Sequence, residues 1–131
     1  MAGYSGTSLM KKLGIKENIK LMLINAPENY MALLEQDLSS QLTGKISEAG
    51  FVHLFVTSKK ELEKQFTKII QSPKEGLMIW ISWYKKSSGL QTDVTEDTIR
   101  KIVLPTGWVD IKVCAVSDVW SGLKIVKRKV K

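Results

Sequence analysis

The chain has very few of the residues that form disulfides and metal sites. Cys114 is its only cysteine and His53 its only histidine in 131 residues. One thiol cannot form a disulfide within the chain, and a zinc site built from several cysteines or histidines is excluded. A lone cysteine suits a reducing compartment, so we expect a cytoplasmic protein without a metal.

Long apolar runs and phosphate-binding loops are also missing. No run approaches the roughly 18 apolar residues that span a bilayer. Lys11 and Lys12 are not followed by the apolar stretch of a signal peptide. Neither a P-loop nor a GxGxxG stretch is present. We therefore expect no membrane association and no bound cofactor.

Acidic residues are outnumbered by basic ones, and the net charge is +7. Such a charge favours nucleic-acid binding, but much of it lies near the C-terminus, in Lys124, Lys127, Arg128, Lys129 and Lys131. No acidic or aromatic residue lies among them, so a stacking surface for single strands is not indicated. A solubilising basic tail on an edge strand is the expected role. The alternative is a weak nucleic-acid binder that acts through this tail.

The apolar residues gather in short segments that predict strands. Residues 76–86, GLMIWISWYKK, begin with an uncharged run of branched and aromatic residues, which suits a central strand buried on both faces. Residues 19–24 and 51–56 predict two more buried strands. His53 lies inside the second of these, and we interpret it as a hydrogen-bonded core residue.

Between these strands the sequence predicts helices. Asn25 and Pro27 suit a helix start, and apolar residues then recur at helical spacing: Met31, Leu34, Leu38 and Leu42. A very short strand could follow at Ile46. Ser58, with Glu61 three residues later, predicts a capped second helix. Thr95 predicts the cap of a third, which Pro105 and Gly107 close.

The C-terminal part predicts a hairpin. Residues 109–116 alternate with the period of a half-buried strand, and residues 123–128 predict a last strand. The short connection cannot cross over to a parallel neighbour, so the two strands should pair antiparallel. We expect an α/β fold with a mixed, mostly parallel sheet, helices on both faces, and a single domain over residues 1–131. An exposed final strand could pair with a second copy, which makes a homo-oligomer a further expectation.

From Phe51 onward the order of elements resembles the second half of class I S-adenosylmethionine-dependent methyltransferases. FVHLFVTS would match their fourth strand, GLMIWISW their fifth, and the hairpin their sixth and seventh. The resemblance implies a three-layer, Rossmann-like (methyltransferase-like) sheet. It fails at the cofactor loop, where those enzymes have an acidic, glycine-rich segment and this chain has Asn25, Ala26, Pro27 and Glu28. Glu48 is the nearest acidic residue for a cofactor ribose, and we interpret it as part of a solvated turn.

A second resemblance runs nearly end to end. The segments MAGYSGTSLMKKLGIK, FVHLFVTS and LPTGWVDIKVCAVSDVWSGLKIVKR are similar to a bacterial family of small proteins of unknown function. This resemblance implies a compact, cytoplasmic bacterial protein. It assigns no activity and no catalytic residue.

No constellation of residues predicts a catalytic centre. His53 lies in the middle of a strand while the loop serines lie at strand ends, so a Ser-His-Asp triad is not expected. Cys114 alternates within a strand, and we interpret it as a small sheet residue. Asp93, Glu96 and Asp97 cluster at a helix start, where they complement the helix dipole or, as the alternative, bind a divalent cation.

The carboxyl ends of the parallel strands are the expected binding edge, because open α/β sheets bind ligands there. The helix that starts at Ser58 points its free N–H groups toward this edge, and two lysines leave the central strand beside it. We predict a shallow anion pocket lined by Asn25, Thr57, Ser58, Trp83, Lys85, Lys86 and Trp120. The simpler interpretation is that Ser58 only caps its helix and both lysines are solvated.

Three functional hypotheses remain. The preferred one is a non-catalytic binding or regulatory module with a degenerate methyltransferase-like fold, whose partner is a small anionic ligand or a protein. A divergent S-adenosylmethionine-dependent methyltransferase, or another small-ligand enzyme, is the second. The weak nucleic-acid binder is the third.

Overall fold

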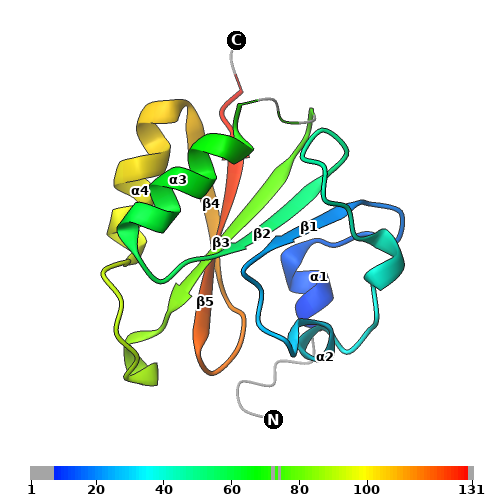
Figure 1. Ribbon diagram of the computed structural model, residues 1–131, viewed down its shortest axis with the longest axis horizontal. Coiled ribbons are helices and arrows are strands. Elements are labelled where there is room, and N and C mark those ends of the chain that lie inside the picture. Colours follow the sequence, from blue (N-terminus) through cyan, green and yellow to red (C-terminus); the bar gives the residue numbers. More distant parts are fainter. Residues whose placement is uncertain (1–7, 72, 74, 130–131) are drawn as a thin grey trace.

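The computed structural model describes residues 8–71, 73 and 75–129, which form one five-stranded mixed sheet (Figure 1). The strands are β1 (Leu21–Ile24), β2 (Phe51–Phe55), β3 (Met78–Tyr84), β4 (Trp108–Ala115) and β5 (Trp120–Lys127). Their order across the sheet is β1-β2-β3-β5-β4. The first three run parallel, and β5 is antiparallel to β3 and to β4. The predicted mixed sheet with a C-terminal hairpin is confirmed.

Helices cover both faces of this sheet and give the fold its three layers (Figure 1). The α-helices of the described residues are α1 (Leu9–Leu13), α2 (Tyr30–Leu34), α3 (Lys59–Ile69) and α4 (Glu96–Val103). α3 and α4 lie side by side on one face, over a core that includes Phe66, Ile81 and Ile99. α1 and α2 pack on the other face, against Phe51 and Trp80. None of these helices is long and apolar enough to cross a bilayer.

The central strands are buried because both of their faces carry apolar side chains. Every residue of β2 is buried, and so are residues 79–83 of β3. Trp80 also donates a hydrogen bond from its indole Nε1 to the Leu13 carbonyl at 2.9 Å. That bond satisfies the one polar atom of a fully buried ring and ties α1 to the central strand.

The helix after β1 is much shorter than the apolar spacing predicts. α2 ends at Leu34, and Glu35 follows in the left-handed conformation, at φ 61°. Asp37 then accepts a hydrogen bond from the Ser39 amide at 3.0 Å, a local bond that competes with continued helix. A 3₁₀ turn, Ser39–Gln41, follows.

Three smaller expectations in this segment are also wrong. Asn25 does not cap a helix, because it lies in the left-handed conformation at φ 59°, directly after β1. Leu42 lies outside any helix and forms an isolated parallel bridge with Leu21 instead. Ile46 lies in a turn and not in a short strand.

The hairpin has the predicted pairing but not the predicted exposure. β5 lies between β3 and β4, so the edge strands of the sheet are β1 and β4, and the final strand is not at an edge. The β4–β5 register shifts between Asp110 and Lys112, where Ile111 is an extra residue opposite β5. Such a bulge reverses the alternation beyond it. Ile111 and Val113 are therefore 55% and 51% exposed, whereas Cys114 is buried.

Candidate functional site

A chain of buried hydrogen bonds joins α2, β2 and β3. The Tyr30 hydroxyl lies 2.8 Å from His53 Nδ1, and His53 Nε2 lies 2.7 Å from the Ser82 hydroxyl. A neutral imidazole can donate from one ring nitrogen and accept at the other, so both hydroxyls are satisfied. The predicted role of His53 as a hydrogen-bonded core residue is confirmed.

Burial keeps the two ionisable side chains of this hydrogen-bonded series, His53 and Tyr30, in their neutral forms. Loss of hydration lowers the pKa of His53 to about 3 and raises the pKa of Tyr30, so both side chains are neutral near pH 7. A serine beside a histidine is the start of a nucleophile–base pair. Here His53 and Ser82 are both fully buried, so no substrate reaches the hydroxyl. The pair is a structural element of the core.

Aromatic rings fill the space next to this chain, toward the carboxyl ends of β2 and β3. Phe55 stacks on His53 with ring centroids 4.3 Å apart and meets the edge of Trp120 at 4.9 Å. Trp120 in turn lies against Tyr84, with centroids 4.5 Å apart. Asn25 Nδ2 donates to the Phe55 carbonyl at 3.5 Å and so bridges the ends of β1 and β2. This edge of the sheet is therefore packed and cross-linked on the face of α1 and α2.

Two of the predicted pocket residues lie at a shallow hollow where β2 leads into α3. The hollow has a volume of about 560 Å³ and is lined by Thr57, Ser58, Leu90, Gln91, Thr92 and Asp93. Ser58 caps α3 by accepting from the Glu61 amide at 3.2 Å. Asp93 Oδ1 accepts from the Lys59 amide at 2.6 Å, so a carboxylate of the chain itself already complements this helix end.

The other predicted pocket residues lie elsewhere. Trp83 is buried on the face of α3 and α4, whereas Trp120 lies on the opposite face. The charge of Lys85 acts on the Cys114 thiol, on the side of α1, and Lys86 is exposed in a 3₁₀ turn. Neither lysine lines the hollow beside Ser58. Binding of an anion at this edge stays a prediction.

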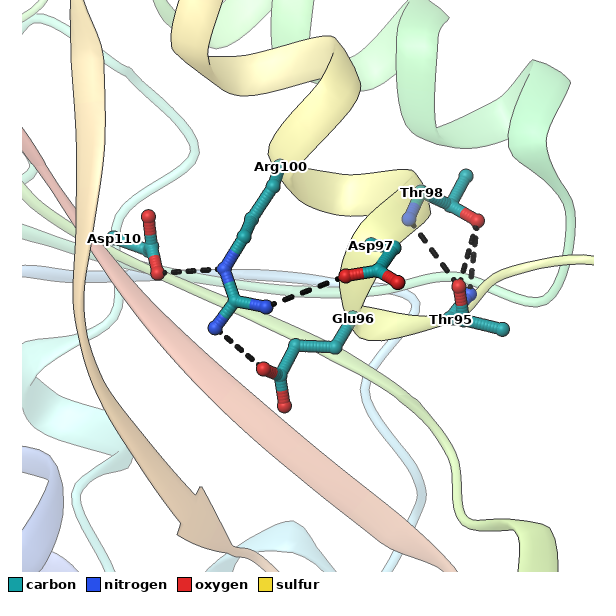
Figure 2. Close-up of polar contacts among 6 residues, drawn as sticks. All are labelled: Thr95, Glu96, Asp97, Thr98, Arg100 and Asp110. Atoms are coloured by element: carbon teal, nitrogen blue, oxygen red, sulfur yellow. Dashed lines mark hydrogen bonds and ion pairs between the residues drawn. The ribbon is translucent and has the colours of Figure 1, made fainter.

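The acidic residues near α4 form ion pairs within the protein (Figure 2). Arg100 contacts Glu96 and Asp97 on its own helix and reaches Asp110 on β4, with Nε 2.9 Å from Oδ2. Thr95 and Thr98 form a reciprocal capping box at the start of α4 (Figure 2). No group of potential metal ligands occurs among the described residues. The network ties α4 to the edge strand.

Lysines that the sequence does not predict to lie together meet at a second hollow, between α1 and β4. This hollow has a volume of about 480 Å³ and is lined by Lys12, Lys112, Val113, Cys114 and Ala115. Lys124 faces Lys112 across the hairpin. The sequence predicts the hairpin. It does not predict the bulge that brings Lys112 and Lys124 opposite each other, because apolar and polar residues alternate without interruption through residues 109–115.

Solved structures share this arrangement of strands and helices. A putative type 11 methyltransferase from Sulfolobus solfataricus matches with a TM-score of 0.62 and 11% identity, over 94% of this chain and 90% of that one. A ribosomal protein L11 methylase from Lactobacillus delbrueckii subsp. bulgaricus matches with a TM-score of 0.55 and 9% identity, over 92% and 75%. A protein in the NADB-Rossmann superfamily from Streptococcus agalactiae matches at 0.53 and 9%, over 93% and 68%.

The chain has a methyltransferase-like fold. At these identities the likeness concerns the fold and carries no activity across. No model of a known protein family and no curated protein matches the chain. The resemblance to a bacterial family of small proteins therefore stays a prediction.

A methyltransferase-like fold implies S-adenosylmethionine, and the residues after β1 do not fit it. Residues 25–29 contain no glycine that would let a ligand approach the backbone, and Asn25 is already bonded to Phe55. Tyr30 turns inward and is only 2% exposed. Glu48, the acidic candidate for the ribose, accepts a hydrogen bond from Thr43 at 3.1 Å within an exposed turn. At this end of β1, Tyr30 and Asn25 are thus engaged in contacts within the protein, while Asn25, Glu28 and Asn29 remain exposed.

Proposed function

We propose that the protein is a non-catalytic binding or regulatory module built on a methyltransferase-like sheet. The observation that carries this proposal is the segment after β1, which has no glycine at residues 25–29 and whose side chains contact the neighbouring strand. There Tyr30 is hydrogen-bonded to the fully buried His53, and Asn25 bridges to the next strand. A cofactor that took the place of Asn25 and Tyr30 would have to displace both contacts.

The cost of breaking these contacts favours the same function. Breaking the Tyr30–His53 bond would leave a buried polar atom without a partner, at a cost of about 1–3 kcal/mol. Opening the adjoining cluster would also expose Phe55, which is 1% exposed. A cofactor that displaced these contacts would have to offset the cost of the broken hydrogen bond and of the exposed Phe55. The state without cofactor is therefore favoured.

The first prediction concerns this cofactor. We expect no saturable binding of S-adenosylmethionine or S-adenosylhomocysteine to the full chain by isothermal calorimetry, and no rise in melting temperature at millimolar ligand. An active class I methyltransferase, measured under the same conditions, is the positive control. Saturable binding at micromolar ligand would reject a module that has lost the cofactor and would favour the divergent enzyme instead.

A further inference from the structure

Lysine side chains from three elements meet around the hollow between α1 and β4. Lys112 and Lys124 are directly opposite each other in the β4–β5 register. Lys112 Nζ also donates to the carbonyl of Lys12 at the end of α1, at 3.1 Å. Lys124 Nζ lies beside Gly14, 3.8 Å from where a Cβ on that glycine would be. Three lysines far apart in sequence thus lie close together, Lys12 and Lys112 in the lining of the hollow and Lys124 beside Lys112.

This arrangement is unfavourable for the isolated protein. Like charges directly opposite on neighbouring strands destabilise a sheet. Partial burial and the charge of Lys112 both lower the pKa of Lys124. Within the described part of the chain, the ion pairs all involve Arg100, so no carboxylate lies within pairing distance of these lysines. The cluster has positive charge that no carboxylate of the described residues neutralises.

Lys85 is a fourth positive group that acts on Cys114, the cysteine in the hollow. Burial raises the pKa of the Cys114 thiol, while the charges of Lys12, Lys112 and Lys85 pull it down. Three ammonium groups are thus close enough to act on one sulfur atom. Lys85, which the sequence places at the carboxyl end of the central strand, belongs to this side of the molecule.

We propose that the hollow lined by Lys12, Lys112 and Cys114, together with Lys124, binds a compact anion with closely spaced phosphate groups, such as a free di- or triphosphate. Ammonium groups act as point charges for phosphate and require no particular plane of approach. Among the described residues, no aromatic side chain lines the hollow, so a stacked nucleic-acid strand is not the favoured ligand. The inference deepens the proposed function because it gives the binding module a ligand class.

The test uses inorganic pyrophosphate and tripolyphosphate as probes on the full chain. Affinity is measured by calorimetry at low and at near-physiological salt, because contacts between charges weaken as salt rises. The site variant is Lys112→Gln with Lys124→Gln. The matched control is Lys60→Gln with Lys64→Gln, which removes the same charge from two exposed positions on α3, on the other face of the sheet.

We expect the wild type and the control to bind tripolyphosphate with the same affinity within twofold, and the site variant to bind at least tenfold more weakly. Without ligand the site variant loses both the repulsion between Lys112 and Lys124 and the hydrogen bond from Lys112 to the Lys12 carbonyl, so its melting temperature should stay close to that of the wild type. Equal binding by the site variant, equal loss in both variants, or no binding by the wild type at low salt would each overturn the proposal. So would a short single-stranded oligonucleotide that binds more than tenfold tighter than tripolyphosphate. None of these results depends on S-adenosylmethionine, so the two proposals fail separately.

Discussion

His53 links the stability of the protein to pH because the folded state keeps it neutral. The pKa of this side chain is about 3 in the folded protein and 6.5 in an unfolded chain. Between these values the unfolded state binds a proton that the folded state does not. The stability that comes from keeping His53 neutral is therefore fully present above about pH 6.5. It is lost progressively as the pH is lowered toward the folded pKa.

Lowering the pH from 7.5 to 5.5 should reduce the free energy of unfolding by about 1.4 kcal/mol, measured by urea titration. His53 is the only histidine, and carboxylates remain largely ionised over this range, so the change has one main source. A His53→Gln variant, compared at the same two pH values, should lose most of this dependence. An unchanged dependence in that variant would show that another group titrates.

The sequence predicted the role of this residue but not its partners. A lone histidine in an apolar strand indicates a core position, and that was sufficient for His53. Tyr30 and Ser82 are 23 and 29 residues away in the chain. Only the parallel register of β2 and β3 and the inward turn of α2 bring them to the ring, and neither is encoded in local spacing.

Among the elements, α3 is stabilised at its N-terminus by a distant loop. Ser58 caps it locally, whereas Asp93 reaches it from the segment before α4. The Thr92 hydroxyl also donates to the Thr57 carbonyl at 2.7 Å, so the same loop is fixed twice. These contacts join the starts of the two helices that cover one face of the sheet.

Replacing Asp93 with alanine should lower the free energy of unfolding by about 1 kcal/mol, because it removes an acceptor from the free amides of a helix start. Asp93→Asn keeps an acceptor oxygen and should cost less than half as much. Urea unfolding of both variants, at neutral pH and one salt concentration, checks the order. Equal losses in the two would mean that the charge and not the hydrogen bond matters.

In the segment between β1 and β2, the apolar spacing did not predict where the helix ends. Leu34 and Leu38 are both buried, as expected for the inner face of a helix. They are nevertheless separated by the left-handed Glu35, and a 3₁₀ turn begins only after Leu38. Burial alone does not require a continuous helix. The hydrogen bond that the Ser39 amide donates to Asp37 cannot be predicted from the spacing of apolar residues.

For the whole molecule, the layered α/β fold followed from the order of apolar segments and the short hairpin connection. The strands predicted from uncharged runs are the central strands, and the helices predicted from the caps Ser58 and Thr95 begin where expected, whereas the one predicted from Asn25 does not. The candidate site could not be predicted in the same way. It depends on side chains brought together by tertiary contacts, such as the pairing of Lys112 with Lys124.

The bulge in β4 has a consequence for how molecules of this protein behave toward one another in solution. Ile111 has no partner on β5, and the pairs on either side, Asp110 with Ile125 and Lys112 with Lys124, are neighbours without it. Deleting Ile111 should therefore leave both halves of the hairpin paired as they are and straighten the outer edge of the sheet. A straight edge is a template for a strand of another molecule, which a bulge discourages. We expect the deletion variant to self-associate with rising concentration in sedimentation velocity. The wild type and an Ile111→Gly variant, which keeps the extra residue, should stay monomeric; a dimeric wild type would mean that the edge is already a contact between copies.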